Sequence, residues 1–176
     1  MKKLVILCVA LMLVLLFASC GKKEAKVEPQ TAVEKVEEPT PQVARPVLSE
    51  EELFQQKSLE QLNKQGILAK INFDYDSYSI RDDMKPILEK NADWLTRFKT
   101  SMILIEGHCD ERGTIEYNMA LGEKRAEATR NYVAALGVTP ERIKIVSYGK
   151  NKPLVKGVDD ASFFQNRRAE FVIIKK

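Results

Sequence analysis

Cysteine, histidine and tryptophan are scarce in this chain of 176 residues, which contains three, one and one of them. Cys8 and Cys20 lie in the N-terminal leader region, so Cys109 is the only cysteine left for a folded domain. A single thiol cannot form an internal disulfide. The composition therefore excludes a small scaffold held together by disulfides.

The chain also lacks a strong excess of charge of either sign. Its formal net charge is +3, and residues 1–19 carry two lysines and no acid, so without them the net charge falls to +1. Proteins that bind nucleic acid present a clustered basic excess. We therefore expect no nucleic-acid partner.

Only one apolar run is long, and it lies at the N-terminus. Lys2 and Lys3 precede fourteen apolar residues, 4–17, which small residues follow. This pattern is typical of a secretory signal peptide, here residues 1–19. A spanning helix needs roughly twenty apolar residues, so an uncleaved anchor is the less favoured alternative.

The end of this leader, Ala18-Ser19-Cys20-Gly21, resembles the bacterial lipobox, although Phe17 stands where leucine is usual. The resemblance implies that Cys20 is acylated and becomes the N-terminus. Each buried methylene contributes about 0.8 kcal/mol, and stable anchoring needs more than one acyl chain. With Gly21 and no aspartate after the cysteine, the resemblance favours the outer membrane, with the protein facing the periplasm of a Gram-negative bacterium.

Three further segments follow Cys20. Residues 20–48 hold four of the seven prolines, balanced charges and no aromatic residue, which predicts a flexible linker behind the lipidated cysteine. Residues 49–66 begin with a capping-box pattern at Ser49 and Glu52, which predicts one short helix. Residues 67–176 are long enough for one ordinary domain.

Hydrophobic periodicity predicts an α/β domain with the element order β-α-β-α-β-β. Strands are expected at residues 67–73, 102–106, 142–148 and 168–174, and helices after Asp83 and at residues 116–136. A polar loop is expected between the last two strands. This order predicts a sandwich in which helices cover one side of a mixed sheet.

Arg125 occupies an unusual position on the second of these helices. It falls in a stripe with Leu121, Ala128, Tyr132 and Leu136, on the side expected to face the core. A buried guanidinium is costly without an acceptor. It therefore pairs with an internal acid, extends to the edge of the core, or serves as an anion receptor.

Asp110 follows the end of a buried strand, where ligand-facing loops of α/β sheets lie. Taken alone, it is equally well a solvated loop acid. Taken with Arg125, it predicts a pocket with one charge of each sign, suited to a zwitterion whose ammonium meets the aspartate and whose carboxylate meets the arginine.

Metal binding and nucleophilic catalysis are both disfavoured by the run His108-Cys109-Asp110-Glu111. Adjacent residues rarely point at one ion, and neighbours on an extended segment face opposite sides. We expect no metal, no cofactor and no enzymatic activity, with Cys109 as a small packed residue and His108 as a structural one.

Three stretches together resemble the peptidoglycan-associated lipoproteins, within the wider family of OmpA-like domains. They are Phe73-Asp74-Tyr75-Asp76-Ser77, the run from Glu106 to Ala126, and Ser147-Tyr148-Gly149 with Asn166-Arg167-Arg168-Ala169-Glu170. The resemblance implies non-covalent binding of peptidoglycan through the meso-diaminopimelate of its stem peptide. It also implies that periplasmic Tol-system proteins are partners and that the protein supports envelope integrity and constriction during cell division.

Carried over residue by residue, the resemblance implies that Asp110 holds the ammonium and Arg125 the carboxylate of diaminopimelate. The remaining implied pocket residues are Phe73, Asp74, Asp76, Thr114, Asn118 and Leu121. One of the two residues Arg167 and Arg168 is implied to reach the rim of the pocket. A purely structural charge at the end of a strand is the equal alternative. Two other functions stay open: an enzyme acting on the same ligand, and a lipoprotein of another envelope assembly, such as secretion or motility machinery.

Overall fold

The computed structural model describes residues 48–176. The predictions for the signal peptide, for lipidation at Cys20 and for most of the linker lie outside this part. Within the described part, no helix combines the length and the apolar character that a membrane span requires.

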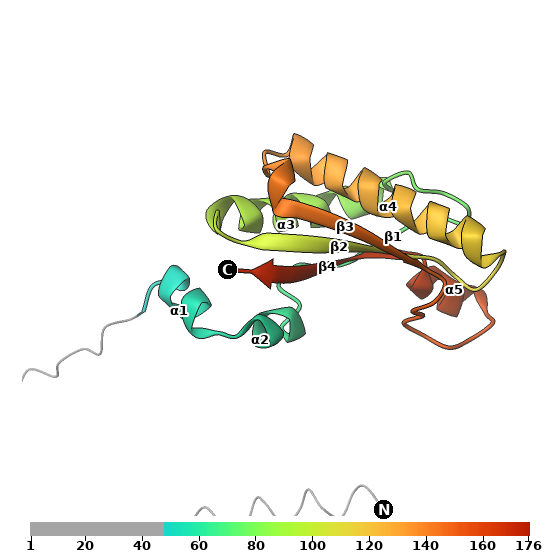
Figure 1. Ribbon diagram of the computed structural model, residues 1–176, viewed down its shortest axis with the longest axis horizontal. Helices are drawn as coiled ribbons and strands as arrows, with labels where there is room; N and C mark the ends of the chain where they lie inside the picture. Colours follow the sequence, from blue (N-terminus) through green and yellow to red (C-terminus); the bar gives the residue numbers. More distant parts are fainter. Residues whose placement is uncertain (1–47) are drawn as a thin grey trace, which may run out of the picture. The chain divides into compact units, whose positions relative to one another are not determined.

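The domain is built on a four-stranded mixed sheet (Figure 1). Its strands lie in the order β1-β4-β2-β3. The pair β2 and β3 is parallel, whereas β4 runs antiparallel to both β1 and β2. The bounds are Ile71–Asn72 for β1, Met102–His108 for β2, Ile143–Gly149 for β3 and Arg168–Lys175 for β4.

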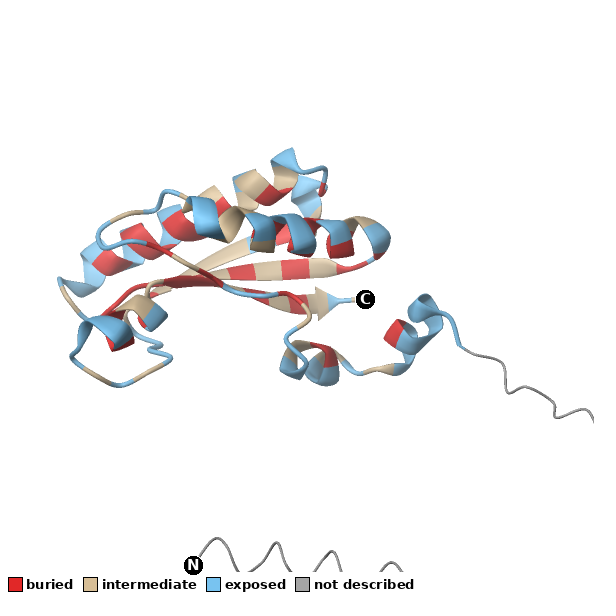
Figure 2. Cartoon of the chain, turned by 180° about the vertical axis from the view of Figure 1, so that it is seen from behind, coloured by how far each residue is buried: buried red, intermediate tan, exposed pale blue. Residues whose placement is uncertain are grey.

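The helices α3 (Lys85–Arg97) and α4 (Ile115–Ala135) lie together on one side of the sheet (Figure 1). Residues of β2 alternate between buried and half-buried, because successive side chains point to opposite faces of a strand. The buried set, including Ile103 and Ile105, packs beneath the helices (Figure 2). The predicted α/β sandwich with a mixed sheet is confirmed.

The N-terminal helical region differs from the prediction. Two helices, α1 (Glu50–Gln56) and α2 (Leu59–Lys64), replace the single helix expected over residues 49–66. The reason is the pair Lys57 and Ser58, since the extended backbone of Lys57 ends the first helix and the side chain of Ser58 caps the second. The side chain of Asn63 then exchanges two hydrogen bonds with the backbone of Ile173, at 2.8 and 3.0 Å, and so attaches α2 to β4.

Two other element predictions need correction. The loop expected before the last strand contains a helix, α5 (Asp160–Asn166), with Asp159 as its N-cap. The first strand is only two residues long, because the chain pairs with β4 only at Ile71 and Asn72. Short 3₁₀ turns precede α3 (η1, Asp82–Met84) and β3 (η2, Pro140–Arg142).

The buried face of α4 is also rotated from the predicted stripe. Leu121 and Arg125 are buried as expected, whereas Ala128 and Tyr132 are half-buried and Leu136 is exposed. The reason is close contact between glycines: a Cβ added at Gly107 would lie 1.8 Å from the carbonyl oxygen of Gly122. Helix α4 therefore rests directly on the backbone of β2, and the buried face continues through Ala126, Thr129 and Val133.

Candidate functional site

A cavity of about 430 Å³ lies where β2 ends and α4 begins. Six of the eight predicted diaminopimelate-binding residues line it: Asp76, Asp110, Thr114, Asn118, Leu121 and Arg125. The other lining residues are Tyr75, Cys109, Arg112, Gly113, Tyr117 and Arg167. The structure therefore brings Asp110 and Arg125 to one cavity.

Phe73 and Asp74 do not line this cavity. Phe73 is fully buried in the core, with its ring 5.2 Å from the guanidinium carbon of Arg125. The carboxylate of Asp74 is exposed and forms a salt bridge with Arg81. These two residues support the site from behind, and the prediction that their side chains form its wall is wrong.

Arg125 is fully buried and is held by backbone carbonyls. Its Nε donates to the oxygen of Ser77 at 2.8 Å, Nη1 to that of His108 at 2.9 Å, and Nη2 to that of Asp74 at 3.1 Å. It neither pairs with an internal acid nor extends to the surface. A guanidinium has five N–H donors, and these bonds use three of them.

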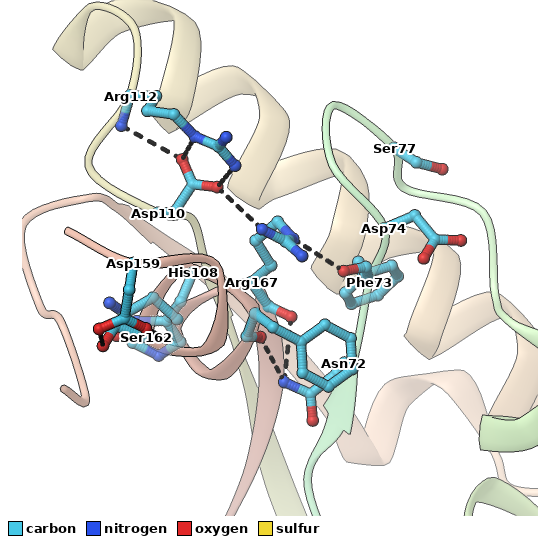
Figure 3. Close-up of polar contacts among 12 residues, drawn as sticks. Asn72, Phe73, Asp74, Ser77, His108, Asp110, Arg112, Asp159, Ser162 and Arg167 are labelled. Carbon is cyan, nitrogen blue, oxygen red and sulfur yellow. Dashed lines mark hydrogen bonds and ion pairs between the residues drawn. The ribbon is translucent and has the colours of Figure 1, made fainter. Parts of the chain in front are cut away.

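Asp110 is also buried, and its carboxylate is already occupied (Figure 3). One oxygen accepts from the backbone N–H and Nε of Arg112 at 3.2 and 3.3 Å. The other accepts from Nη2 of Arg112 at 2.6 Å and Nη1 of Arg167 at 3.3 Å. Burial alone would raise the pKa of Asp110, but these hydrogen bonds outweigh it and hold the pKa below its usual value.

Arg112 is the main residue that sequence reasoning missed. Its guanidinium lies between two aromatic rings, 4.1 Å from the centroid of Tyr75 and 4.4 Å from that of Phe163. Its position two residues after Asp110 was the available signal, because such spacing permits a local side-chain pair. The stacking on Tyr75 and Phe163 comes from distant parts of the chain and had no local signature.

The open question about Arg167 and Arg168 is resolved by geometry. Arg167 lines the cavity and also donates from Nε to the carbonyl oxygen of Phe73 at 3.0 Å (Figure 3). Arg168 does not line the cavity, and its Nε pairs with Glu170 at 3.0 Å. Arg167 is the C-cap residue that follows α5, whereas Arg168 is the first residue of β4.

The start of α4 closes one side of the cavity. Thr114 caps the helix by accepting a hydrogen bond from the backbone N–H of Tyr117 at 3.2 Å. Asn118 donates to the carbonyls of Arg112 and Thr114 at 2.7 and 2.9 Å, which fixes the loop above it. At the rim, the Tyr117 hydroxyl donates to Asp76, and this bond raises the pKa of Tyr117.

Cys109 and His108 are both buried, but only Cys109 lines this cavity. The Cys109 thiol donates to the carbonyl oxygen of Asn118 at 3.3 Å, and burial raises its pKa to about 11. Burial likewise lowers the pKa of His108 to about 4. Cys109 is a packed residue, as predicted, and its thiol is protonated at neutral pH.

The charges around the cavity suit a ligand that carries at least one anionic group. Two acids, Asp76 and Asp110, face three arginines, Arg112, Arg125 and Arg167. Bidentate guanidinium groups bind carboxylates with both charge and geometry. The arrangement can therefore hold a carboxylate, and through the aspartates it can also hold an ammonium group.

Sequence comparison finds curated relatives that bear one name. A peptidoglycan-associated lipoprotein of Agrobacterium fabrum is 50% identical over 104 residues, which are 59% of this chain and 59% of that protein. The peptidoglycan-associated lipoprotein of Haemophilus influenzae is 43% identical over 99 residues, or 56% of this chain and 65% of that one. The matches thus span about three-fifths of the relatives' length. These relatives are named as lipoproteins, and not as enzymes.

Among solved structures, the peptidoglycan-associated lipoprotein of Burkholderia pseudomallei matches with a TM-score of 0.58 and 48% identity, covering 59% of this chain and 88% of that one. A cell wall anchor of the T6SS from Pseudomonas aeruginosa matches with a TM-score of 0.52 and 26% identity, covering 61% and 80%. The OmpA family model matches residues 72–167, more than half of the chain, and this range includes strands β2 and β3. The chain therefore belongs to the OmpA family.

Proposed function

We propose that this protein is a lipid-anchored clamp that binds peptidoglycan non-covalently and joins the outer membrane to the cell wall. The observation that carries the proposal is the pair Asp110 and Arg125, two buried side chains of opposite charge that line one cavity. The proposed ligand is meso-diaminopimelate in the stem peptide, whose side chain ends in an ammonium and a carboxylate. The names of the most similar relatives support the same ligand class.

Arg125 is proposed to bind the carboxylate of diaminopimelate. Its three bonds to the carbonyls of Asp74, Ser77 and His108 fix the orientation of the guanidinium before the ligand arrives. Such pre-organisation reduces the entropy lost on binding. The cost of burying this charge without an acid falls when a ligand carboxylate enters, so the site favours an anion.

Asp110 is proposed to bind the ammonium only after Arg112 moves. A carboxylate offers about four lone-pair positions, and Arg112 and Arg167 together occupy four. The Arg112 side chain is 35% exposed and can leave, whereas that of Arg167 is 11% exposed. The ligand ammonium thus takes the place of the Arg112 guanidinium beside Asp110. Arg112 is proposed to stay near Tyr75 at the rim of the cavity.

The other residues are proposed to shape the cavity rather than to carry charge to the ligand. Thr114, Asn118 and Leu121 form the side contributed by α4, and Asp76 closes the rim through Tyr117. Phe73 and Asp74 hold Arg125 from behind. This division assigns specificity to Arg125 and Asp110, and fit to the remaining side chains.

The test is sedimentation of the full chain, in detergent, with purified sacculi. Asp110→Asn keeps the shape of the side chain but removes its charge, and we expect it to lose most of the binding. Asp93→Asn, an exposed acid on α3, is the matched control and should bind normally. Equal binding by the natural chain and Asp110→Asn would refute the assignment.

A second comparison tests the ligand itself. Sacculi whose stem peptides carry lysine lack the terminal carboxylate of diaminopimelate, so Arg125 has nothing to bind there. We expect at least tenfold weaker sedimentation than with sacculi of the diaminopimelate type. Release of soluble fragments from either kind would indicate an enzyme instead.

The outer-membrane anchor is proposed to be acylated Cys20. Cys20→Ala should release the protein into the soluble periplasmic fraction, because no acyl chain remains to hold it. Cys8→Ala, within the leader, is the control and should stay with the membrane. Membrane retention of Cys20→Ala after normal processing would contradict the lipid anchor.

Partnership with periplasmic Tol-system proteins, and a role in constriction, are proposed from the family resemblance. A purified Tol propeller protein should bind the full chain in a pull-down. Similarity to a solved T6SS cell wall anchor supports, at lower identity, the alternative of another envelope assembly. Deletion distinguishes them: envelope leakage and chained cells support the Tol role, whereas a loss confined to secretion supports the alternative.

A further inference from the structure

A second polar cluster lies on the sheet face that points away from α4. It consists of Glu106 and His108 on β2 and Glu170 on β4. Because Gly107 faces Gly122 of α4, its neighbours on the strand face the other side. The ligand-capable atoms of the three side chains all lie within 4.8 Å of one another, and Nε2 of His108 is 3.5 Å from Oε2 of Glu106.

His108 is the unusual member of this cluster. It is 1% exposed, and within residues 48–176 neither ring nitrogen has a hydrogen-bond partner. Buried polar atoms are nearly always paired, so an unpaired imidazole aimed at two carboxylates requires an explanation. The ring packs against Tyr148, with centroids 5.6 Å apart, and this contact satisfies neither nitrogen.

The two carboxylates add a second argument. Glu106 and Glu170 are directly opposed in the register of β2 and β4, and like charges in that position destabilise a sheet. Two cations lie near these carboxylates and reduce the repulsion between them only in part. Arg168 engages one oxygen of Glu170 at 3.0 Å, and the ammonium of Lys152 lies over the Tyr148 ring at 3.4 Å.

We propose that Glu106, His108 and Glu170 form a binding site for a divalent transition-metal ion of the zinc type. One imidazole nitrogen and two carboxylate oxygens are donors that Zn²⁺ accepts. With bonds of about 2.0–2.2 Å, tetrahedral donors lie roughly 3.3–3.6 Å apart, which is close to the 3.5 Å between His108 and Glu106. Glu170 completes the set by a small side-chain rotation.

The surroundings suit such a site. The neutral imidazole is the form of histidine that binds metals. The side chains of Glu106 and Glu170 are 17% and 39% exposed, which leaves an entry path from solvent. Arg168 orients Glu170 through its second oxygen, as outer partners of metal ligands do. The site is independent of the proposed peptidoglycan function.

The test uses the single histidine of the chain, which gives one set of imidazole signals. Full chain without an affinity tag, in detergent and labelled with ¹⁵N-histidine, is titrated with ZnCl₂ and followed by NMR. We expect both ring nitrogens to shift and reach saturation at about one equivalent. MgCl₂, which prefers all-oxygen octahedral sites, should leave them unchanged. If the chemical shifts of the imidazole nitrogens do not change up to millimolar Zn²⁺, this result alone overturns the proposal.

Two substitutions then locate the site. Glu170→Gln removes one donor charge and should weaken Zn²⁺ at least tenfold by calorimetry, and Glu106→Gln should do the same. Glu141→Gln, an exposed acid, is the control and should bind as the natural chain does. Unchanged affinity in both folded variants would place the ion elsewhere and refute the site. If circular dichroism shows that one variant does not fold, the other variant and the NMR titration still test the proposal.

Discussion

Replacing Arg125 by alanine tests whether this side chain is structural as well as ligand-binding. The substitution removes three hydrogen bonds that a charged donor makes to the carbonyls of Ser77, His108 and Asp74. It therefore releases the segment after β1 from the end of β2 and from α4. We expect a clear loss of stability in addition to any loss of binding.

The magnitude follows from two opposing effects. Each hydrogen bond from a charged donor contributes about 1.5–3 kcal/mol, so three contribute several kcal/mol. Two effects reduce this loss. The substitution removes the cost of burying a guanidinium that has no paired acid. In addition, water can hydrate the carbonyls of Asp74 and Ser77, which are more exposed than His108. We expect a net loss of about 3 kcal/mol, which lowers Tm by roughly 10 °C for a domain of this size.

The assay is urea unfolding of the full chain, followed by the fluorescence of Trp94, the only tryptophan. Trp94 is buried against Phe54 and Phe98, so its emission reports the intact core. The matched control is Arg130→Ala on the same helix, which breaks a partly exposed pair with Glu127 and an exposed hydrogen bond to Asn131, and should cost under about 0.5 kcal/mol. If Arg125→Ala proves as stable as Arg130→Ala, the three carbonyl bonds contribute nothing and our reasoning is wrong.

Three further predictions follow from single contacts. Gly107→Ala should prevent normal folding by circular dichroism, because its Cβ would lie 1.8 Å from the Gly122 carbonyl oxygen; a native spectrum and Tm would contradict this contact. Arg112→Ala should bind diaminopimelate stem peptide at least as tightly as the natural chain in calorimetry, since the competitor for Asp110 is gone; weaker binding would exclude the proposed exchange. The Cys109 thiol should react with iodoacetamide at pH 8 roughly 200-fold more slowly than a free thiol, because a pKa of about 11 leaves little thiolate; a rate near that of free cysteine would contradict its burial.

The fold was predictable from sequence to the extent that it depends on local pattern. Alternating and helical hydrophobic periods predicted β2, β3, β4, α3 and α4 to within a few residues. The failures occurred where local pattern was weak. Helix α5 has only seven residues, and its N-cap Asp159 stands in a run that also suits a loop.

The candidate site was predictable in its charges but not in their partners. Burial of Asp110 and Arg125 in one cavity could be inferred from a charge on an apolar face and an acid after a strand. Their hydrogen-bond partners could not be inferred. Arg125 donates to backbone carbonyls, and every residue has one, so the residue types do not reveal these partners. Likewise, Glu170 joins Glu106 and His108 only through the pairing of β4 with β2.

His108 joins the two sites through one residue. Its backbone carbonyl accepts a hydrogen bond from Nη1 of Arg125 at 2.9 Å on the side of the cavity, while its side chain lies near Glu106 and Glu170 on the other face of the sheet. The end of β2 has little room to adjust, because Gly107 lies directly against the backbone of α4. The His108 carbonyl that orients Arg125 therefore lies on a strand segment with little freedom to move, and a rigid carbonyl favours a pre-organised guanidinium.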